Sequence, residues 1–364
     1  MESNKKSFSW GKFIYGFFSV PFYLLFFLTL SARFLDPEHF SYIGLFGFLF
    51  VPLFILQFVV WLYWIRYRRT FFAGLSTIFL FISLFYFRDT FQFFNNSEEK
   101  GLTVMTWNVK NFDLYNWSHN KDTRAKMLKL IDSVDADIMC FQEFFTDKDQ
   151  FQNIDAIKKL GYKHYYFEST YEDKLHNSWG LAIFSKFPIS EKEVLKNVFS
   201  PKTNNITIKA LVKTPKGNYK VYNSHLKSIH FGYEDYDYIH DLKNKHKYDK
   251  MKTASIVLKM LRAYPKRSLQ AKSIVEDMDK EKAEKIIYCC DMNDIPSSHS
   301  YGLFRKKMQD AFTEKGCGFS PTYDLAFPFL RIDYVFASDA VSINGYKVLE
   351  KSLSDHYPVV CWME

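Results

Sequence analysis

The sequence predicts a helical membrane segment followed by an α/β domain with mixed sheets. The composition of the chain divides it in this way. Of 39 phenylalanines, 23 precede residue 95, whereas 40 of 48 Lys and Arg residues and 36 of 40 Asp and Glu residues follow it. Beyond residue 100, short apolar runs alternate with amphipathic stretches, as strands and helices do in α/β proteins. The second part has about 270 residues, which is long enough for one large core.

Three stretches of the first part contain no Asp, Glu, Lys or Arg, namely residues 13–32, 40–65 and 70–87. At about 1.5 Å per residue each can cross a hydrocarbon core of about 30 Å, the third only just. Pro21 and Pro52 are tolerated in membrane helices, where neighbouring groups satisfy the freed carbonyls. A cleavable signal peptide is disfavoured, because the first run exceeds the usual apolar length of about 7–15 residues. We expect residues 1–94 to contact a lipid bilayer through three transmembrane helices.

The orientation of these helices is predicted from the basic residues beside them, which are more frequent on the cytoplasmic side of a membrane. The N-terminal flank and the second loop each contain three, whereas the first loop and the exit of the third stretch contain one each. The N-terminal flank contains Lys5, Lys6 and Lys12, and the second loop contains Arg66, Arg68 and Arg69. The first loop contains Arg33, and Arg88 follows the third stretch. We therefore expect an integral protein of the plasma or bacterial inner membrane. Its N-terminus would be cytoplasmic and its larger domain extracytoplasmic, in the periplasm where there is one.

The net charge of +8 is shared equally, because 8 basic and 4 acidic residues precede residue 95 while 40 basic and 36 acidic residues follow it. A charge of +4 on the second part permits a polyanionic partner without requiring one. The five cysteines include no CxxC pair, so neither a zinc site nor a disulfide framework is predicted. Nothing in the sequence indicates a protein partner.

Residues 95–100 are polar and are expected to link the membrane segment to a domain of residues 101–364. A first strand is predicted at 102–109, and Asp122 can cap the helix that follows. The sequence Pro215-Lys216-Gly217-Asn218 predicts an antiparallel hairpin. Further strands are expected at 138–141, 180–184, 206–212, 219–223, 286–290, 332–336 and 357–362. Helices are expected near 251–261, 271–278 and 298–307, and a long surface loop at 230–248.

Most of the polar side chains lie at or just after the ends of these strands, whereas Asp333 lies inside a strand and Asp355 and His356 precede the last one. Residues distant in sequence converge at strand ends in layered α/β folds. These polar side chains are Asn108, Glu143, Asn223, His225, Asp291, Asn293, Asp333, Asp355 and His356. Oxygen ligands without cysteine suit a hard cation such as Mg²⁺ or Mn²⁺. Two histidines beside several carboxylates suit acid–base attack of water on phosphorus.

For some of these residues a purely structural role is an alternative. Asn108 and Asn223 could tie off strand ends, Asp333 could pair with Arg331, and His225 could be a hydrogen-bonded core histidine. Glu143 is harder to explain in this way, because a buried carboxylate without compensation is costly.

Seven sequence blocks resemble, in order, those of the endonuclease/exonuclease/phosphatase superfamily, whose fold is that of deoxyribonuclease I. They are residues 106–109 (TWNV), 138–143 (IMCFQE), 180–189 (GLAIFSKFPI), 223–226 (NSHL), 291–296 (DMNDIP), 331–334 (RIDY) and 354–359 (SDHYPV). The resemblance covers nearly all of residues 101–364. It implies a four-layer α/β sandwich of two mixed, mainly antiparallel sheets.

The resemblance also implies roles for the residues of a metal site and of the attacking water. Glu143 would be the principal ligand of Mg²⁺ or Mn²⁺, with Asn108 beside it and Asp355 completing the site. Asp291 would orient or deprotonate the water, and Asn293 would position Asp291 and a phosphate oxygen.

Further residues are implied to contact the phosphate. His356 would stabilise the developing charge, held by Asp333 through its other ring nitrogen. His225 would contact the phosphate as a general acid, and Asn108 and Asn223 would help to bind it. The chemistry implied is metal-assisted, in-line displacement by water.

The substrate is less well determined than the reaction. Phe144 and Phe145 follow the metal-binding Glu143, where the apurinic-site endonucleases of the family usually carry Thr-Lys. The sphingomyelinase and inositol-phosphatase branches share the same core. We expect a phosphodiester substrate and favour a nuclease. A lipid or small-molecule phosphoesterase is the alternative, and an inactive binding module is disfavoured because the site residues are all present.

Overall fold

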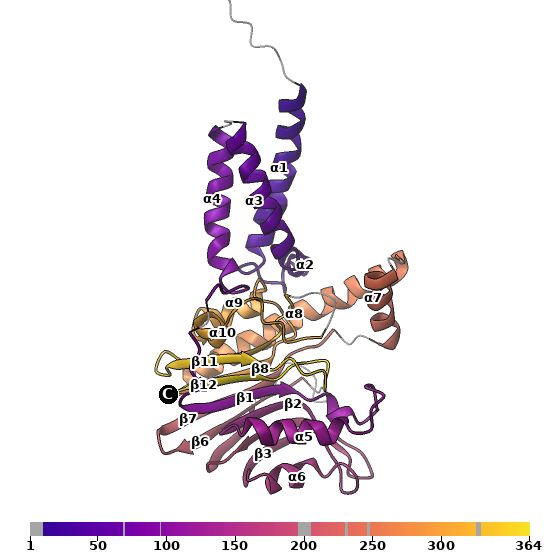
Figure 1. Cartoon of the computed structure of the whole chain (residues 1–364), viewed down its shortest axis with the longest axis vertical. Helices are drawn as coiled ribbons and strands as arrows, with labels where there is room; N and C mark the ends of the chain where they lie inside the picture. Colours follow the sequence, from indigo (N-terminus) through magenta and orange to yellow (C-terminus); the bar gives the residue numbers. More distant parts are fainter. Residues whose placement is uncertain are drawn as a thin grey trace, which may run out of the picture.

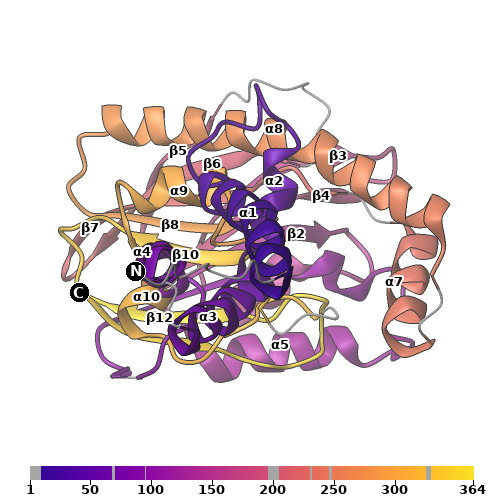
Figure 2. The ribbon, with the colours of Figure 1, turned by 90° about the horizontal axis from the view of Figure 1, so that it is seen from above.

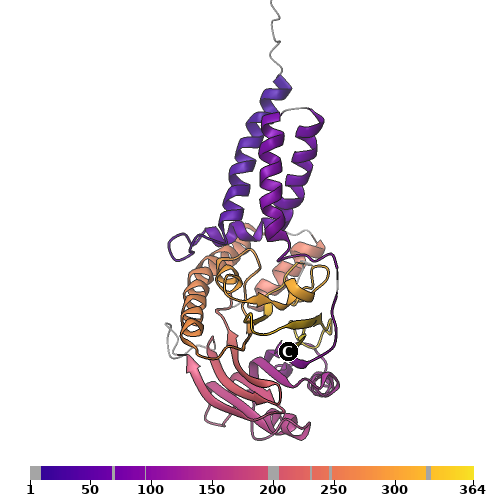
Figure 3. The same cartoon turned by 90° about the vertical axis from the view of Figure 1, so that its left-hand side faces the viewer.

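A bundle of apolar helices stands on a globular α/β domain in the computed structural model of the chain (Figure 1). The structure describes residues 10–67, 70–94, 96–195, 205–229, 232–245, 248–324 and 329–364. The helices of the N-terminal part are α1 (Trp10–Ser31), α2 (Ile43–Phe48), α3 (Phe50–Arg66) and α4 (Thr70–Phe87). The long helices α1, α3 and α4 run side by side away from the domain, and the short α2 lies at their foot (Figures 1 and 3).

The three charge-free stretches are mostly helical, but they differ from the predicted spans. The second is divided at Leu49 into α2 and α3, and the 17 residues of α3 extend only about 25 Å. By length and composition, α4 alone among the described helices could cross a membrane. The apolar segment Ser19–Ser31 of α1 is shorter than a membrane span. Lys5, Lys6, Arg68 and Arg69, which the predicted orientation uses, lie outside the described residues.

Two six-stranded sheets form the centre of the domain. The first has the order β11-β12-β1-β2-β4-β3 and the second β5-β6-β7-β8-β10-β9. Only β1–β2 and β7–β8 pair in parallel among the described strands, so the mixed, mainly antiparallel prediction is correct. The first sheet comprises β1 (Leu102–Asn108), β2 (Ile138–Thr146), β3 (His164–Glu172), β4 (Ser178–Ser185), β11 (Ile343–Val348) and β12 (Val359–Met363). The second comprises β5 (Ile189–Leu195), β6 (Thr207–Thr214), β7 (Gly217–His225), β8 (Ile286–Asp291), β9 (Gln309–Asp310) and β10 (Asp333–Ala337).

Three buried clusters hold the layers together. The first lies between the sheets, where Val104 and Ile183 pack with Val221 and Val335. The second covers the outer face of the first sheet beneath α5 (Thr123–Val134) and α6 (Asn153–Lys159). The third covers the outer face of the second sheet beneath α8 (Lys250–Lys280) and α9 (His299–Arg305). The order helix, sheet, sheet, helix is the predicted four-layer sandwich (Figure 3).

Several elements differ from those expected. The predicted loop at 230–248 contains the helix α7 (Tyr233–Lys245), which is stabilised by tertiary contacts. Its Asp235 pairs with Lys259 of α8, and its Tyr238 hydroxyl lies 2.6 Å from the Thr253 hydroxyl. The two helices predicted at 251–261 and 271–278 are one helix, α8, which continues through Pro265. The strands β3, β5, β9 and β11 were not predicted, and β5 is an edge strand whose charged residues are exposed.

The helical bundle is held against the domain by polar contacts. In the connection between α1 and α2, Asp36 forms an ion pair with Lys272 and accepts a 2.8 Å hydrogen bond from the Ser268 hydroxyl, both on α8. The end of α4 is held through Asp89, which pairs with Arg33 and whose carbonyl accepts a hydrogen bond from Arg331. The bundle is therefore seated directly on the domain, with α2 in contact with α8 (Figure 2).

Candidate active site

The ends of β1, β2, β7, β8 and β10 bring the polar residues of both sheets together. In the second sheet, Asp291 is paired in register with His225 on one side and with Asp333 on the other. In the first sheet, Asn108 is paired with Gln142, which precedes Glu143. Because the sheets pack face to face, these two sets of side chains meet in one place.

Asp291 is the centre of this cluster and is fully buried. Its Oδ2 accepts a 2.9 Å hydrogen bond from the Asn108 side chain, and its Oδ1 accepts a 3.0 Å hydrogen bond from the Asn293 backbone N–H. The Nε2 atoms of His225 and His356 lie 3.5 and 3.8 Å from the same Oδ2. A carboxylate held in this way is oriented as an acceptor of protons.

Glu143 reaches the cluster because the β2 backbone is distorted at this residue. The pairing of β2 with β4 shifts register between Phe141 and Phe144, and Glu143 has a φ of 46°. This left-handed conformation is unfavourable for a residue other than glycine and is often found at functional sites. The bulge turns the Glu143 carboxylate toward Asn108, whose Nδ2 lies 3.3 Å from Oε1.

His356 and Asp333 form a buried pair that joins the two sheets. The His356 Nδ1 lies 2.9 Å from Asp333 Oδ2. Burial alone would lower the pKa of His356, but the carboxylates of Asp333 and Asp291 raise it to about 10. Burial raises the pKa of Asp333 to about 6, although the charge of His356 opposes this shift. At neutral pH His356 is therefore a cation that faces the cluster through Nε2.

Arg331 and Asp333 do not form the ion pair that the sequence left open. Arg331 instead pairs with Asp310 at 2.8 Å, and both side chains are buried.

The alternative interpretation of His225, a hydrogen-bonded core histidine, is also wrong. Within the described part of the chain, neither ring nitrogen of His225 has a hydrogen-bond partner, although the residue is buried. A buried imidazole without partners is costly unless a ligand satisfies it.

The position of Asn223 differs from the predicted phosphate-binding role. Its Nδ2 donates to the carbonyls of Phe141 and Ala182, and its Oδ1 accepts from Gln142, at 2.7–3.0 Å. The amide is thus fully engaged between the two sheets, and we assign Asn223 a structural rather than a phosphate-binding position. Sequence spacing could not distinguish it from His225, two residues later on the same face of β7.

Asp355 is paired with a residue that the sequence did not indicate. The Lys110 ammonium lies 2.8 Å from Asp355 Oδ2 and 4.9 Å from the centre of the Trp117 ring. Lys110 begins the short turn η1 (Lys110–Asp113), in which four consecutive residues have positive φ. Such a turn has no sequence signature, so only the folded chain places this cation beside the site.

Two groups of side chains could hold a divalent cation. Asp291, Asp333 and His356 offer ligand atoms within 4.8 Å of one another, but Asp333 and His356 are already paired. Glu143 and Asp355 are partly exposed in the pocket, with side-chain exposures of 33% and 20%. Hard cations such as Mg²⁺ retain water and use one or two carboxylates, which suits this second group. The Asn108 amide oxygen accepts the Lys110 backbone N–H at 3.0 Å, while its amide nitrogen faces the carboxylates of Glu143 and Asp291.

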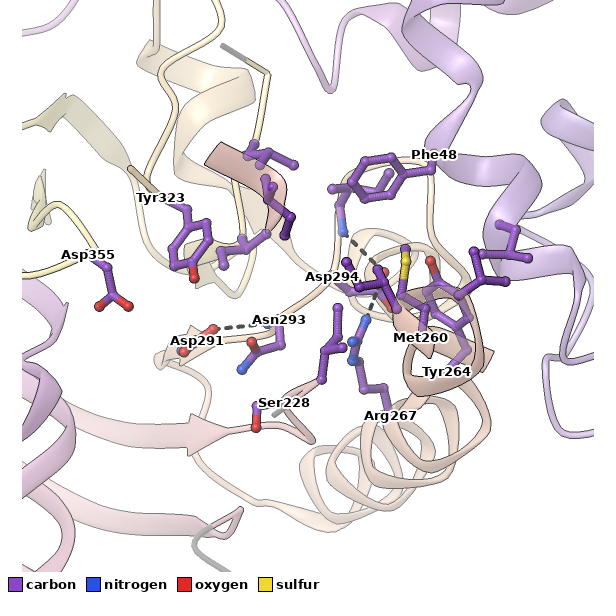
Figure 4. Close-up of a pocket in the computed structure, with 18 of the residues that line it drawn as sticks. Phe48, Ser228, Met260, Tyr264, Arg267, Asp291, Asn293, Asp294, Tyr323 and Asp355 are labelled. Atoms are coloured by element: carbon purple, nitrogen blue, oxygen red, sulfur yellow. Dashed lines mark hydrogen bonds and ion pairs between the residues drawn. The ribbon is translucent and has the colours of Figure 1, made fainter. Parts of the chain in front are cut away.

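The cluster opens into a large pocket with a volume of about 1540 Å³. Asp291, Asn293 and Asp355 lie on one side of it, as Figure 4 shows. Met260, Tyr264 and Phe48 lie on the other side, next to the helical N-terminal part. One end of the pocket therefore carries the polar cluster, and the other end, called the apolar end below, is mainly apolar, with the paired Arg267 and Asp294 beside Met260 and Tyr264.

The sequence and the fold were compared with known proteins. Residues 105–356 match the model of the endonuclease/exonuclease/phosphatase family, and residues 11–90 match a domain of unknown function. No curated protein matches the chain.

Solved structures are similar to the catalytic part. One is an endonuclease/exonuclease/phosphatase from Beutenbergia cavernae, with a TM-score of 0.50 and 18% identity, covering 72% of this chain and 71% of that one. Another is the human nocturnin catalytic domain with bound sulfate, with a TM-score of 0.51 and 18% identity, covering 77% and 98%. At these identities the likeness shows the fold alone.

Proposed function

The chain belongs to the endonuclease/exonuclease/phosphatase family, whose members hydrolyse phosphate esters, and on this premise we propose how its site works. A water molecule attacks phosphorus in line with the leaving oxygen, and Asp291 accepts the proton of that water. The observation that carries the proposal is the position of Asp291 between Asn108, Asn293, His225 and His356. A base held by two donors requires little reorganisation during the reaction.

The two histidines act on different oxygens of the phosphate. His356 is cationic at neutral pH and donates from Nε2 to a non-bridging oxygen, where negative charge develops. Asp333 holds the other ring nitrogen and fixes the orientation of the ring. No residue in the described part of the chain is hydrogen-bonded to the ring nitrogens of His225, which supplies the proton for the leaving oxygen.

A divalent cation, Mg²⁺ or Mn²⁺, fits the oxygen atoms of Glu143 and Asp355 at the pocket wall. When bound, such a cation withdraws charge from a phosphate oxygen. Lys110 forms an ion pair with Asp355, which holds this carboxylate in place and balances part of the acidic charge. Asn108 connects Glu143 to Asp291 and so links the cation-binding carboxylate to the base.

For the membrane part we propose that α1, α3 and α4 together anchor the enzyme in a bilayer. Their common direction away from the domain supports this, as does the apolar composition of all three helices. The basic flanking residues favour a cytoplasmic N-terminus and an extracytoplasmic catalytic domain.

The experiment that tests the reaction uses the full chain in detergent with Mg²⁺, a chromogenic phosphodiester, plasmid DNA, RNA and phospholipids. We expect turnover of the chromogenic ester that EDTA abolishes. Asp291→Asn should lower it about 10²- to 10⁴-fold, the usual contribution of a general base. The exposed Glu172 provides a control variant, Glu172→Gln, which should match the wild type. Turnover that survives both EDTA and Asp291→Asn would contradict the proposal.

A further inference from the structure

The apolar end of the pocket is built from elements that lie outside the two sheets. Leu45 and Phe48 come from the short membrane-side helix α2, Leu242 from α7, and Val257 and Met260 from α8. None of these residues belongs to the catalytic cluster. They nevertheless line the same pocket as Asp291 and His356. The pocket is thus continuous from the reacting groups to the helical N-terminal part.

From this continuity we propose, resting on the function above, that the substrate is a membrane lipid with a phosphate ester head group. The phosphate binds at the catalytic cluster, and the hydrocarbon chains lie along α2, α7 and α8. At about 1540 Å³ the pocket is larger than the usual range of about 300–1,000 Å³ for small-molecule sites. A sugar phosphate would leave the apolar end empty, whereas a lipid fills both ends.

The charges of the pocket support a lipid over a nucleic acid. Among the described residues, its wall carries five acidic side chains and three cationic ones, namely Lys110, Arg267 and His356. Lys110 is already paired with Asp355, and Arg267 with Asp294. Channels for nucleic acid need an excess of positive charge along the phosphate backbone of the bound strand. This excess of acidic side chains disfavours binding of a polyanion, but it is compatible with a single phosphate group bound together with a divalent cation.

The position of the pocket also suits a lipid. The α2 wall lies at the foot of the helical bundle, so the apolar end faces the proposed membrane (Figures 1 and 4). Around it, Tyr42, Leu49 and Leu242 are lining residues that are also exposed, by 67%, 40% and 40%. Exposed apolar residues beside a deep pocket provide a path for hydrocarbon from the bilayer. A lipid that enters from the bilayer passes through the apolar end of the pocket before its head group reaches the catalytic cluster.

The test uses the full chain in mixed detergent micelles with Mg²⁺. Three substrates are compared: dioleoyl and dihexanoyl phosphatidylglycerol, and the chain-free ester bis(p-nitrophenyl) phosphate. Phosphatidic acids with the same chains serve as the monoester arm. Val257→Trp fills the apolar end, and Leu258→Trp is the matched control, because the neighbouring Leu258 does not line the pocket and is 52% exposed. Leu242→Trp is a second blocking variant on the more exposed wall.

We expect the wild type to prefer a dioleoyl lipid over its dihexanoyl counterpart by about tenfold or more in kcat/KM, the effect of burying roughly two further CH₂ groups. Val257→Trp or Leu242→Trp should remove this preference and leave turnover of the chain-free ester unchanged. Leu258→Trp should keep the preference. Equal turnover of both chain lengths, or a preference that both blocking variants retain, would overturn the lipid proposal. Absence of Mg²⁺-dependent turnover of the chain-free ester would instead refute the proposed reaction.

Discussion

At the residue scale, the least expected feature of the site is the backbone of Glu143. The sequence places this glutamate directly after an apolar strand, but its side chain reaches Asn108 only through a bulge with a φ of 46°. A non-glycine residue in this region costs of the order of 1–3 kcal/mol. The strain is compatible with a folded chain because the surrounding residues of β2 are buried.

Glu143→Gln should therefore abolish activity without destabilising the fold. The neutral amide keeps the shape of the side chain but lowers its affinity for a divalent cation, so we expect turnover to fall by about 10²-fold or more. Isothermal titration with Mg²⁺ should show weaker binding, and the melting temperature should stay within the range of the wild type. Undiminished Mg²⁺ binding would remove Glu143 from the cation site.

The pair of His356 and Asp333 makes stability depend on pH. The pKa of His356 is raised to about 10 in the folded protein, above the value of about 6.5 for an unfolded histidine. Its contribution to stability is therefore complete below about pH 6.5 and is lost as the pH rises through about 10. We expect the difference in melting temperature between the wild type and His356→Gln, measured in EDTA, to shrink over this interval. A difference that is constant from pH 6 to about 10 would show that His356 is neutral in the fold.

Asn223 and Asn293 provide a matched comparison of a structural and a functional amide. Asn223→Ala removes one of the two acceptors of the Gln142 amide and the side-chain donor to two carbonyls, so it should destabilise the protein by about 1–3 kcal/mol. The folded fraction should retain its activity. Asn293→Gly should have the opposite profile, because Asn293 lines the pocket and glycine adopts its φ of 54° without strain. Unfolding curves and turnover per folded molecule distinguish the two, and a catalytic loss in Asn223→Ala would return it to the phosphate site.

At the element scale, α2 and α8 join the membrane part to the catalytic domain. A Cβ atom at Gly44 of α2 would lie 2.5 Å from ring carbons of Tyr264 on α8, and Tyr264 is buried. The glycine is required here for close approach of a backbone to a ring, rather than for a special φ. The pocket wall formed by α2 depends on this contact.

Gly44→Ala should consequently loosen the contact between α2 and α8. Overpacking of this kind costs about 1–3 kcal/mol, and the melting temperature should fall accordingly. A second substitution, Tyr264→Leu, removes the colliding ring atoms and should restore much of the loss in the double variant. If Gly44→Ala is as stable as the wild type, α2 is not packed on Tyr264.

Elements were predicted best where hydrophobic periodicity alone decides them. The strands β1, β2, β7 and β8 are buried runs with polar ends, and such runs need little tertiary information. The helix α7 has alternating acids, tyrosines and lysines, and its contacts with α8 make it a helix. The two helices predicted at 251–261 and 271–278 form the single helix α8, and the buried Tyr264, Arg267 and Ser268 hold it together across Pro265.

At the scale of the whole molecule, the two parts of the chain are connected by specific contacts. Asp36, Asp89 and Gly44 from the helical part each contact the domain. The residues that follow Asn95 are also bound, since the Ser97 hydroxyl accepts the backbone N–H of Tyr346 at 2.9 Å. We infer that the enzyme is held at a defined height above the proposed membrane rather than on a flexible tether.

The proposed topology predicts which side of the membrane carries the active site. A reporter phosphatase that folds only outside the cytoplasm, fused after Glu364, should be active in cells, because an odd number of crossings separates the two ends. The same reporter fused within the second loop should be inactive. Activity of a strictly cytoplasmic reporter after Glu364 would require the opposite orientation.

The sequence by itself determined the chemistry of this protein. The order of its polar residues at strand ends, and the match of residues 105–356 to one family, are local properties of the chain. The tertiary structure decided which of these residues face a ligand and what else surrounds them. Asn223 turns into the core, Lys110 reaches Asp355, and α2, α7 and α8 close a pocket around the site. The physical reason is that each of these depends on contacts between segments far apart in sequence, which no local pattern encodes.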